Sequence, residues 1–172
     1  MSKVMFILPS ERFRDEELFV TKDVLEKAGH KVDIASTKKG VCHGSRGGNI
    51  TVNLILDEVK TDSYSAVVFV GGGGSKLLWK NETAHKIAND FNNQGKVVAA
   101  ICLAPVTLAY AGLLKGKKAT VAGTEAKTID SMGATYTGPG VITDGSIVTA
   151  NAPKASELFG QRISELLALS NT

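Results

Sequence analysis

The chain has 172 residues, of which 43% are hydrophobic and 22% are charged; this length and balance are typical of one globular domain and exclude a disordered chain. Twenty basic and seventeen acidic side chains leave a formal charge of +3. Because no block of five like charges occurs, nucleic acid is not an expected partner.

The apolar runs and the cysteine count exclude further classes of protein. The longest apolar run, 97–106, is ten residues long, whereas a membrane span needs roughly 20, so no membrane partner is expected. Lys3 is followed by an apolar run without a cleavage site, which is not the pattern of a signal peptide. Two cysteines, Cys42 and Cys102, are too few for a disulfide scaffold or a cysteine zinc site. We therefore expect a cytoplasmic protein with no metal and no cofactor.

Apolar segments of strand length alternate along the chain with amphipathic segments of helix length. In chain order, the periodicity predicts a strand at 3–8, a helix at 15–28, a strand at 31–36, a hairpin or small β excursion over 40–54, a strand at 65–70, a helix at 83–93, a strand at 96–101, a helix at 105–111, short strands at 118–121 and 147–150, and a last helix over about 155–167. Residues 9–14 are predicted to form a polar loop, and Leu158 is expected on the buried face of the last helix. The alternation predicts one α/β domain, 1–172, with a mainly parallel sheet covered by helices on both faces.

Three loops are expected to meet in such a fold. Sites in open parallel sheets form at the carboxyl ends of the strands. The segments that follow three predicted strands are the loop after Leu8, the four glycines after Val70, and Cys102 after Ile101.

The segment around Cys102 has the form of a nucleophile elbow. A sharp strand-to-helix turn needs small residues two places on either side of the nucleophile, and Ala100 and Ala104 meet that need. Pro105 suits a first helical turn, and the positive end of a helix favours a thiolate. The alternative is that Cys102 is a small buried hydrophobic residue between strand and helix.

The other two loops carry glycines and an acid. Gly71, Gly72 and Gly73, with Gly74, permit backbone N–H groups to point into a site as an oxyanion hole requires, or they form a plain flexible turn. Glu17 lies near the start of the first predicted helix, where acids usually complement the helix dipole. The topology nevertheless places Glu17 beside the other loops, where it could stay protonated and donate to a thiolate.

The three histidines are the possible imidazole bases. His30 follows a helix-ending glycine and His85 lies among polar helical residues, so both are expected at the surface. His43 lies beside Cys42 in the glycine-rich excursion, and this pair alone is too small for a metal site.

Together these segments resemble the ThiJ/PfpI superfamily, which includes PfpI-type intracellular peptidases and the parkinsonism-associated deglycase. The resemblance spans nearly the whole chain, and its hairpin segment is more similar to the PfpI branch. The segments that carry it are 13–18, 29–32, 39–41, 57–59, 70–72, 99–102 and 144–145.

The resemblance implies a flavodoxin-like three-layer α/β sandwich that forms a homodimer or a higher homo-oligomer. It also implies that Cys102 is the reactive cysteine and Glu17 the acid in contact with it. The amides of Gly72 and Leu103 would form the oxyanion hole, and the pocket would include Gly71 and Gly73, with Ala122.

The chain departs from the family where imidazoles are expected. The peptidase branch has His directly after the elbow cysteine, where this chain has Leu103. Its third triad member is a Glu from a neighbouring subunit, and the corresponding residue here is Lys76. Ala122 occupies the place of a deglycase-branch His and a peptidase-branch Tyr.

This pattern ranks three hypotheses. Peptide hydrolysis needs an acid for a poor amine leaving group, and general acid catalysis is worth about 10²–10⁴-fold, so a PfpI-type peptidase ranks last. Addition of a thiolate to a reactive carbonyl such as methylglyoxal expels no amine, and Glu17 could carry the proton; this predicts a glyoxalase III or deglycase-type enzyme in stress protection. Oxidation of Cys102 by an oxidant needs only a thiolate, access and donors, which predicts a non-enzymatic redox sensor.

Overall fold

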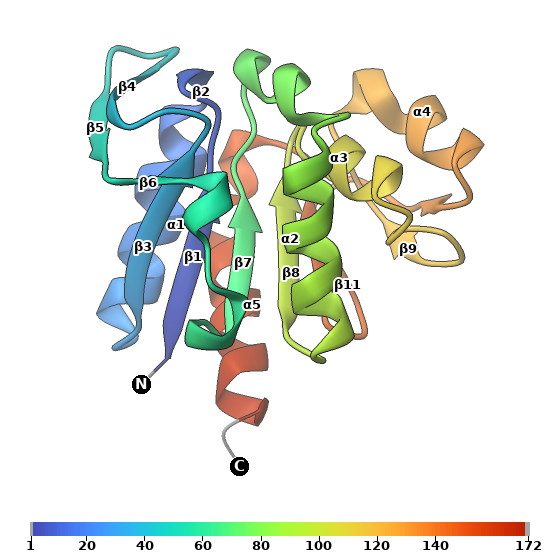
Figure 1. Cartoon of the computed structure of the whole chain (residues 1–172). Helices are drawn as coiled ribbons and strands as arrows, with labels where there is room; N and C mark the ends of the chain where they lie inside the picture. The colour runs from blue at the N-terminus through green and yellow to red at the C-terminus, as the bar shows by residue number, and fades with distance from the viewer. Residues whose placement is uncertain (1, 171–172) are drawn as a thin grey trace.

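A seven-stranded sheet forms the centre of the computed structural model, which describes residues 2–170. Its order is β11-β12-β8-β7-β1-β3-β6, and Figure 1 shows helices on both of its faces. The strands are β11 (Val141–Asp144), β12 (Ile147–Ala150), β8 (Val97–Ile101), β7 (Ala66–Phe69), β1 (Lys3–Ile7), β3 (Lys31–Ser36) and β6 (Leu54–Ile55). Neighbouring strands are parallel except for β11 and β12. The predicted mainly parallel sheet is confirmed.

The central strands are apolar because both faces of the sheet are covered. Val97–Ile101 and Ala66–Phe69 are buried at every position, and β1 is exposed only at Lys3. Their parallel register aligns Phe69 of β7 with Ala100 of β8 and Ile7 of β1. These three strands therefore end together, and their following loops share one edge of the sheet.

Helices cover both faces of the sheet. On one face lie α1 (Asp15–Lys27) and α5 (Ser156–Ser170), and on the other lie α2 (Glu82–Asn93) and α3 (Pro105–Tyr110). The first pair packs closely at Gly160, where an added Cβ would lie 3.0 Å from the side chain of Val24. The three-layer sandwich expected from the sequence is confirmed.

The hairpin belongs to a second, small sheet beside α1. Its three strands run in the order β2 (Glu11–Phe13), β4 (Gly40–Gly44) and β5 (Asn49–Val52). Residues 11–13 had been predicted as loop because Glu-Arg-Phe carries no apolar period. Pairing with β4 makes this segment a strand. The hairpin is also part of the core rather than a loose excursion, because Cys42 and Val52 are buried.

Several short elements were not predicted. They are β10 (Thr135–Tyr136), α4 (Ala126–Ser131) and the 3₁₀ turns η1 (Leu56–Glu58), η2 (Thr61–Ser63), η3 (Gly73–Leu78), η4 (Gly123–Glu125) and η5 (Pro153–Ala155). The predicted strand over 118–121 is shorter in the structure, as β9 (Lys118–Ala119), and Leu158 is 40% exposed instead of buried. On α5 the buried row is Phe159, Ile163 and Leu167, so Leu158 turns away from the sheet.

Over the described residues, the helices are too short or too polar for any of them to span a bilayer.

Candidate functional site

Cys102 lies at a strained turn directly after β8. Its φ is +64°, a left-handed conformation that is uncommon for a residue with a side chain. Its N–H donates to the carbonyl of Ala150 at 2.8 Å, and its carbonyl accepts from the N–H of Ala122 at 2.7 Å. Such strain costs of order 1–3 kcal/mol and persists only where surrounding structure holds it. The turn therefore has the geometry of the predicted elbow, and α3 begins three residues later at Pro105.

Glu17 reaches the elbow from the first turn of α1. It is fully buried, and its Oε1 accepts a hydrogen bond from the N–H of Gly71 at 2.9 Å. Its Oε2 is buried without a well-formed hydrogen bond to any residue in 2–170. The thiol of Cys102 nevertheless lies within electrostatic contact of this carboxyl. The carboxyl and the thiol are therefore close neighbours at the elbow.

Burial controls the ionisation of this pair. Removal from water raises the pKa of Glu17 to about 8, although contact with Cys102 and Gly71 opposes the rise. Burial also raises the pKa of the Cys102 thiol, and a charged Glu17 would raise it further. That second effect needs a carboxylate, whereas Glu17 is mainly protonated at neutral pH. While it is protonated, Glu17 can donate to the sulfur, and this hydrogen bond favours the thiolate form of Cys102.

The backbone N–H groups of Leu103 and Gly72 are the candidate donors of an oxyanion hole. The N–H of Leu103 donates toward the Cys102 sulfur and lowers the pKa of the thiol. Gly72 has a φ of +104°, and neither its N–H nor that of Leu103 donates to a backbone carbonyl within 2–170. Free N–H groups at a strained loop are the donors that an oxyanion or sulfinate requires.

Gly71 and Gly73 differ in the space that the surrounding atoms leave for a side chain. A Cβ on Gly71 would lie 2.5 Å from Glu17 Oε1 and 3.0 Å from the Cys102 Cβ. A glycine is therefore needed here for the carboxyl and the thiol to meet. Gly73 is open, since the nearest atom to its Cβ position is Arg12 Nη1 at 4.0 Å. Ala122 joins the site through its bond to the Cys102 carbonyl.

Three consecutive acids at the start of α1 have three different partners. Asp15 accepts from the N–H groups of Arg46 and Gly48, at 2.9 and 2.7 Å, and so ties the hairpin tip to the helix. Glu16 holds Arg14 through an ion pair of 2.9 Å. Only the third acid of this run, Glu17, is buried at the elbow, so the helix-dipole explanation is incomplete for all three.

The histidines make no hydrogen bond to Cys102 within 2–170. His30 Nε2 lies 3.3 Å from Ser164 Oγ on α5, and His43 is exposed on β4. His85 Nε2 lies 2.7 Å from the carbonyl of Trp79. His30 and His85 are half-buried rather than surface residues, which corrects the sequence prediction, but each is oriented by another part of the fold.

Residues that the sequence analysis passed over complete the surroundings. The N–H of Arg14 donates to Gly71 at 3.0 Å, and its guanidinium is close enough to lower the pKa of Cys102 and Glu17. Trp79 Nε1 donates to the carbonyl of Leu103 at 2.9 Å and ties η3 to the elbow. The sequence does carry a signal for Arg14, because it is a cation three residues before Glu17. It carries none for Trp79, which lies 24 residues from Leu103 and meets it only in the folded protein.

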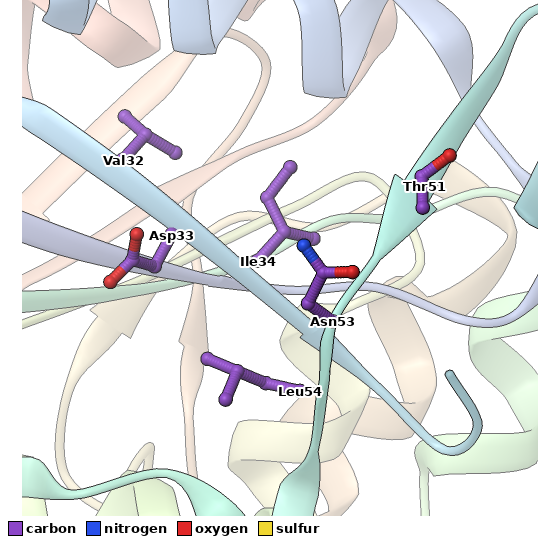
Figure 2. A pocket seen from close by; sticks show the side chains of 6 residues that line it. All are labelled: Val32, Asp33, Ile34, Thr51, Asn53 and Leu54. Carbon is purple, nitrogen blue, oxygen red and sulfur yellow. The ribbon is translucent and has the colours of Figure 1, made fainter. Parts of the chain in front are cut away.

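A separate cavity of about 350 Å³ lies beside β3 and the edge strand β6 of the sheet. Figure 2 shows its lining, from β3, β5 and β6: Val32, Asp33, Ile34, Thr51, Asn53 and Leu54. Two strands, β7 and β1, lie between β3 and β8 in the sheet, and Cys102 does not line this cavity. Across 2–170, no cluster of three His, Cys, Asp or Glu side chains could hold a metal ion.

Known proteins share both the sequence and the fold. The model of the DJ-1/PfpI family matches residues 2–166. An uncharacterized protein of Methanocaldococcus jannaschii is 44% identical over 173 residues, which covers 99% of this chain and 84% of that protein. Deglycase PfpI of Pyrococcus furiosus is 36% identical, with 88% and 90% covered. The crystal structure of a ThiJ/PfpI domain protein from Brachyspira murdochii has a TM-score of 0.95 and 31% identity, with 96% of each chain covered.

Proposed function

Because the chain belongs to the DJ-1/PfpI family, we propose that it is a deglycase-type enzyme that acts on reactive carbonyls through Cys102, with Glu17 as proton donor and acceptor. The relative from Pyrococcus furiosus carries the name deglycase. We place the activity in the cytoplasm, in protection against carbonyl stress.

The single observation that carries this proposal is the meeting of a thiol, a protonatable carboxyl and the backbone N–H of Leu103 at one strained turn. Cys102 supplies the nucleophile. The pKa of Glu17, raised to about 8 by burial, leaves this carboxyl protonated near neutral pH yet able to release its proton. An acid of this kind can give a proton and take it back within one reaction cycle.

Addition to an aldehyde suits this set of groups. The Cys102 sulfur forms a bond to the aldehyde carbon, and the carbonyl electron pair moves to oxygen. The N–H groups of Gly72 and Leu103 would hold that oxygen while Glu17 delivers its proton to it. The product is a hemithioacetal, and no leaving group has departed. For methylglyoxal, proton transfer between the two carbons followed by water attack on the resulting thioester yields lactate and frees the thiol.

Peptide hydrolysis is less well supported. Its amine leaving group needs an acid on the leaving side, and a histidine supplies it in Cys–His enzymes. Leu103 occupies the position after the cysteine, and His85 is bonded to the carbonyl of Trp79. Glu17 would then have to serve both the nucleophile and the leaving group.

A redox role for Cys102 is the second candidate. The N–H groups and the carboxyl that would hold an oxyanion can also hold the oxygens of a cysteine sulfinate. This role requires no turnover, so it stands if the carbonyl activity fails.

Lactate formation from methylglyoxal tests the proposed function. We expect Cys102→Ser to lower the rate by at least about 100-fold, because covalent catalysis is lost. The matched control is Cys42→Ala, which removes the other thiol and should leave the rate within about twofold. If the wild type and Cys102→Ser form lactate equally fast, the enzymatic proposal is wrong and the redox role remains.

A further inference from the structure

Cations gather at the rim of the Cys102 site, on the loops that surround Gly71–Gly74. We propose that Arg12 is a specificity-determining residue that selects carbonyl substrates carrying an anionic group, such as a carboxylate or a phosphate. This inference rests on the proposed function, because it names the substrate class of the same site.

The backbone of Arg12 is held against the glycine loop. Its φ is +56°, a conformation in which glycine or asparagine is more common. Any Cβ on Gly72 would collide with the Arg12 carbonyl, and one on Gly74 would collide with the carbonyl of Glu11. The two segments therefore pack backbone against backbone, and the position of Arg12 relative to the site is fixed by the fold.

The side chain of Arg12 also follows this loop. Its Nη1 lies 4.0 Å from the Cβ position of Gly73. Gly73 is two residues from Gly71, which touches both Cys102 and Glu17, and two residues span at most about 7.6 Å. A small substrate bonded to Cys102 can therefore extend along the glycines toward the guanidinium.

Arg12 is the arginine of this rim that has no acidic partner within 2–170. Arg14 is occupied by Glu16, with three contacts between 2.9 and 3.2 Å. Arg12 makes no ion pair within the described part of the chain, not even with its neighbour Glu11. A planar guanidinium without a carboxylate partner is suited to bind a carboxylate or phosphate through two parallel N–H bonds.

The neighbouring groups leave the rim positive. Lys76 of η3 lies with its ammonium 5.9 Å from the centre of the Trp79 ring, and Trp79 is bonded to the elbow. Glu16 offsets the charge of Arg14, and burial keeps Glu17 mainly neutral near pH 7. Arg12 and Lys76 make no ion pair within 2–170 and lie beside a mainly neutral thiol–carboxyl pair, which favours an anion.

A pair of thiol reagents with opposite charge tests the inference without need of turnover. Sulfonatoethyl and trimethylammonioethyl methanethiosulfonate each form a mixed disulfide with a thiolate and release methanesulfinate. The readout is the ratio of their rates at Cys102, followed by intact mass and divided by the same ratio for 2-mercaptoethanol. We expect Arg12→Gln to lower this ratio roughly three- to tenfold, and added salt to shrink the difference.

The controls separate charge from structure. Arg12→Lys keeps the charge and should stay within about twofold of the wild type in this ratio. Arg162→Gln removes a cation from α5, where its partner is Glu165, and should leave the ratio unchanged. Melting curves for each variant show whether the positive-φ position still folds. A folded Arg12→Gln protein with the wild-type ratio would overturn the inference.

Turnover gives a second, distinguishable arm. We compare methylglyoxal with 3-phosphooxy-2-oxopropanal, which has the same oxoaldehyde group and a phosphate. In Arg12→Gln, kcat/KM should fall about tenfold for the phosphate substrate and stay within about twofold for methylglyoxal. Equal losses for both substrates would count against the inference. Absence of Cys102-dependent turnover on either substrate would instead refute the proposed function, while the reagent ratio would still decide the role of Arg12.

Discussion

The hairpin around Cys42 and the elbow around Cys102 place the same side chain in two different settings. Burial raises the pKa of both thiols. Cys42 lies inside β4 with no exposed surface, among apolar side chains and near Ser36. Cys102 lies after the end of a strand, is half-buried, and meets Glu17 and the N–H of Leu103.

This comparison shows that burial alone does not distinguish the two thiols. Both cysteines lose solvation, which disfavours a thiolate. At Cys102 a protonated carboxyl and a backbone donor can stabilise the charged form, whereas Cys42 has the Ser36 hydroxyl and the weaker influence of Lys38, which Glu11 opposes. That hydroxyl is already engaged, since Ser36 Oγ donates to the carbonyl of Leu8 at 2.7 Å. The difference lies in the neighbours that the fold supplies.

The largest expected effect is on the pH dependence of stability. The folded pKa of Glu17, about 8, exceeds its ordinary value of 4.5. Between these pH values the folded state holds a proton that the unfolded state has lost, so the free energy of unfolding falls as pH rises. Glu17→Gln mimics the protonated acid and should remove this slope. Between pH 4.5 and 8 the variant should gain roughly 3–5 kcal/mol relative to the wild type, measured by urea unfolding.

Glu16→Gln is the matched control for this prediction, because it changes the adjacent acid. Its hydrogen bond to Arg14 lowers the pKa of Glu16. Its stabilisation is therefore present above the ordinary pKa and lost as pH falls, the opposite sign to Glu17. A Glu17→Gln protein with the wild-type pH slope would mean that the carboxyl is ionised in the folded state.

The second-largest effect is expected from a change in the close packing at the elbow. Gly71→Ala forces a methyl group against Glu17 and Cys102. We expect a loss of about 2–3 kcal/mol in thermal unfolding and slower alkylation of Cys102, because overpacking separates the pair. Gly73→Ala has open space and should change stability by less than about 0.5 kcal/mol. Equal stability of the two variants would refute the close approach.

The third prediction compares the two thiols directly. Mild peroxide should add oxygen to Cys102 at least about ten times faster than to Cys42, because only Cys102 combines partial exposure with donors for a sulfinate. Peptide mapping by mass spectrometry gives the two rates in one sample. Similar rates at both cysteines would remove the basis of the redox candidate.

The smallest effect concerns the cover over Cys42. Asp15→Asn weakens the bonds to Arg46 and Gly48 that hold the hairpin tip, at a cost of about 1 kcal/mol. Cys42 should then react faster with iodoacetamide while Cys102 is unaffected. Asp23→Asn, which alters an exposed ion pair with Lys27 on the same helix, is the control and should change neither rate. Faster alkylation of Cys102 would mean that the hairpin supports the elbow as well.

Local patterns predicted the parts of the molecule that local forces shape. The strands 31–36 and 147–150 match the observed β3 and β12, since their residues alternate or run apolar within a short window. The elbow was predictable because Ala100, Ala104 and Pro105 satisfy a turn that involves only neighbours in the chain. By contrast, β2 is a strand through its pairing with β4, and Cys42 is buried by segments distant in sequence.

The sequence by itself determined the α/β alternation and the family resemblance, and it predicted a sharp turn at Cys102. Only the tertiary structure decided the charge state of the site and its rim. Glu17 is an ordinary acid of a first helical turn until packing removes its water and raises its pKa to about 8. Arg12 is an ordinary polar residue until the glycine loop packs against its backbone. Solvation and Coulomb interactions depend on distance in space, and the fold brings these groups together from separate parts of the chain.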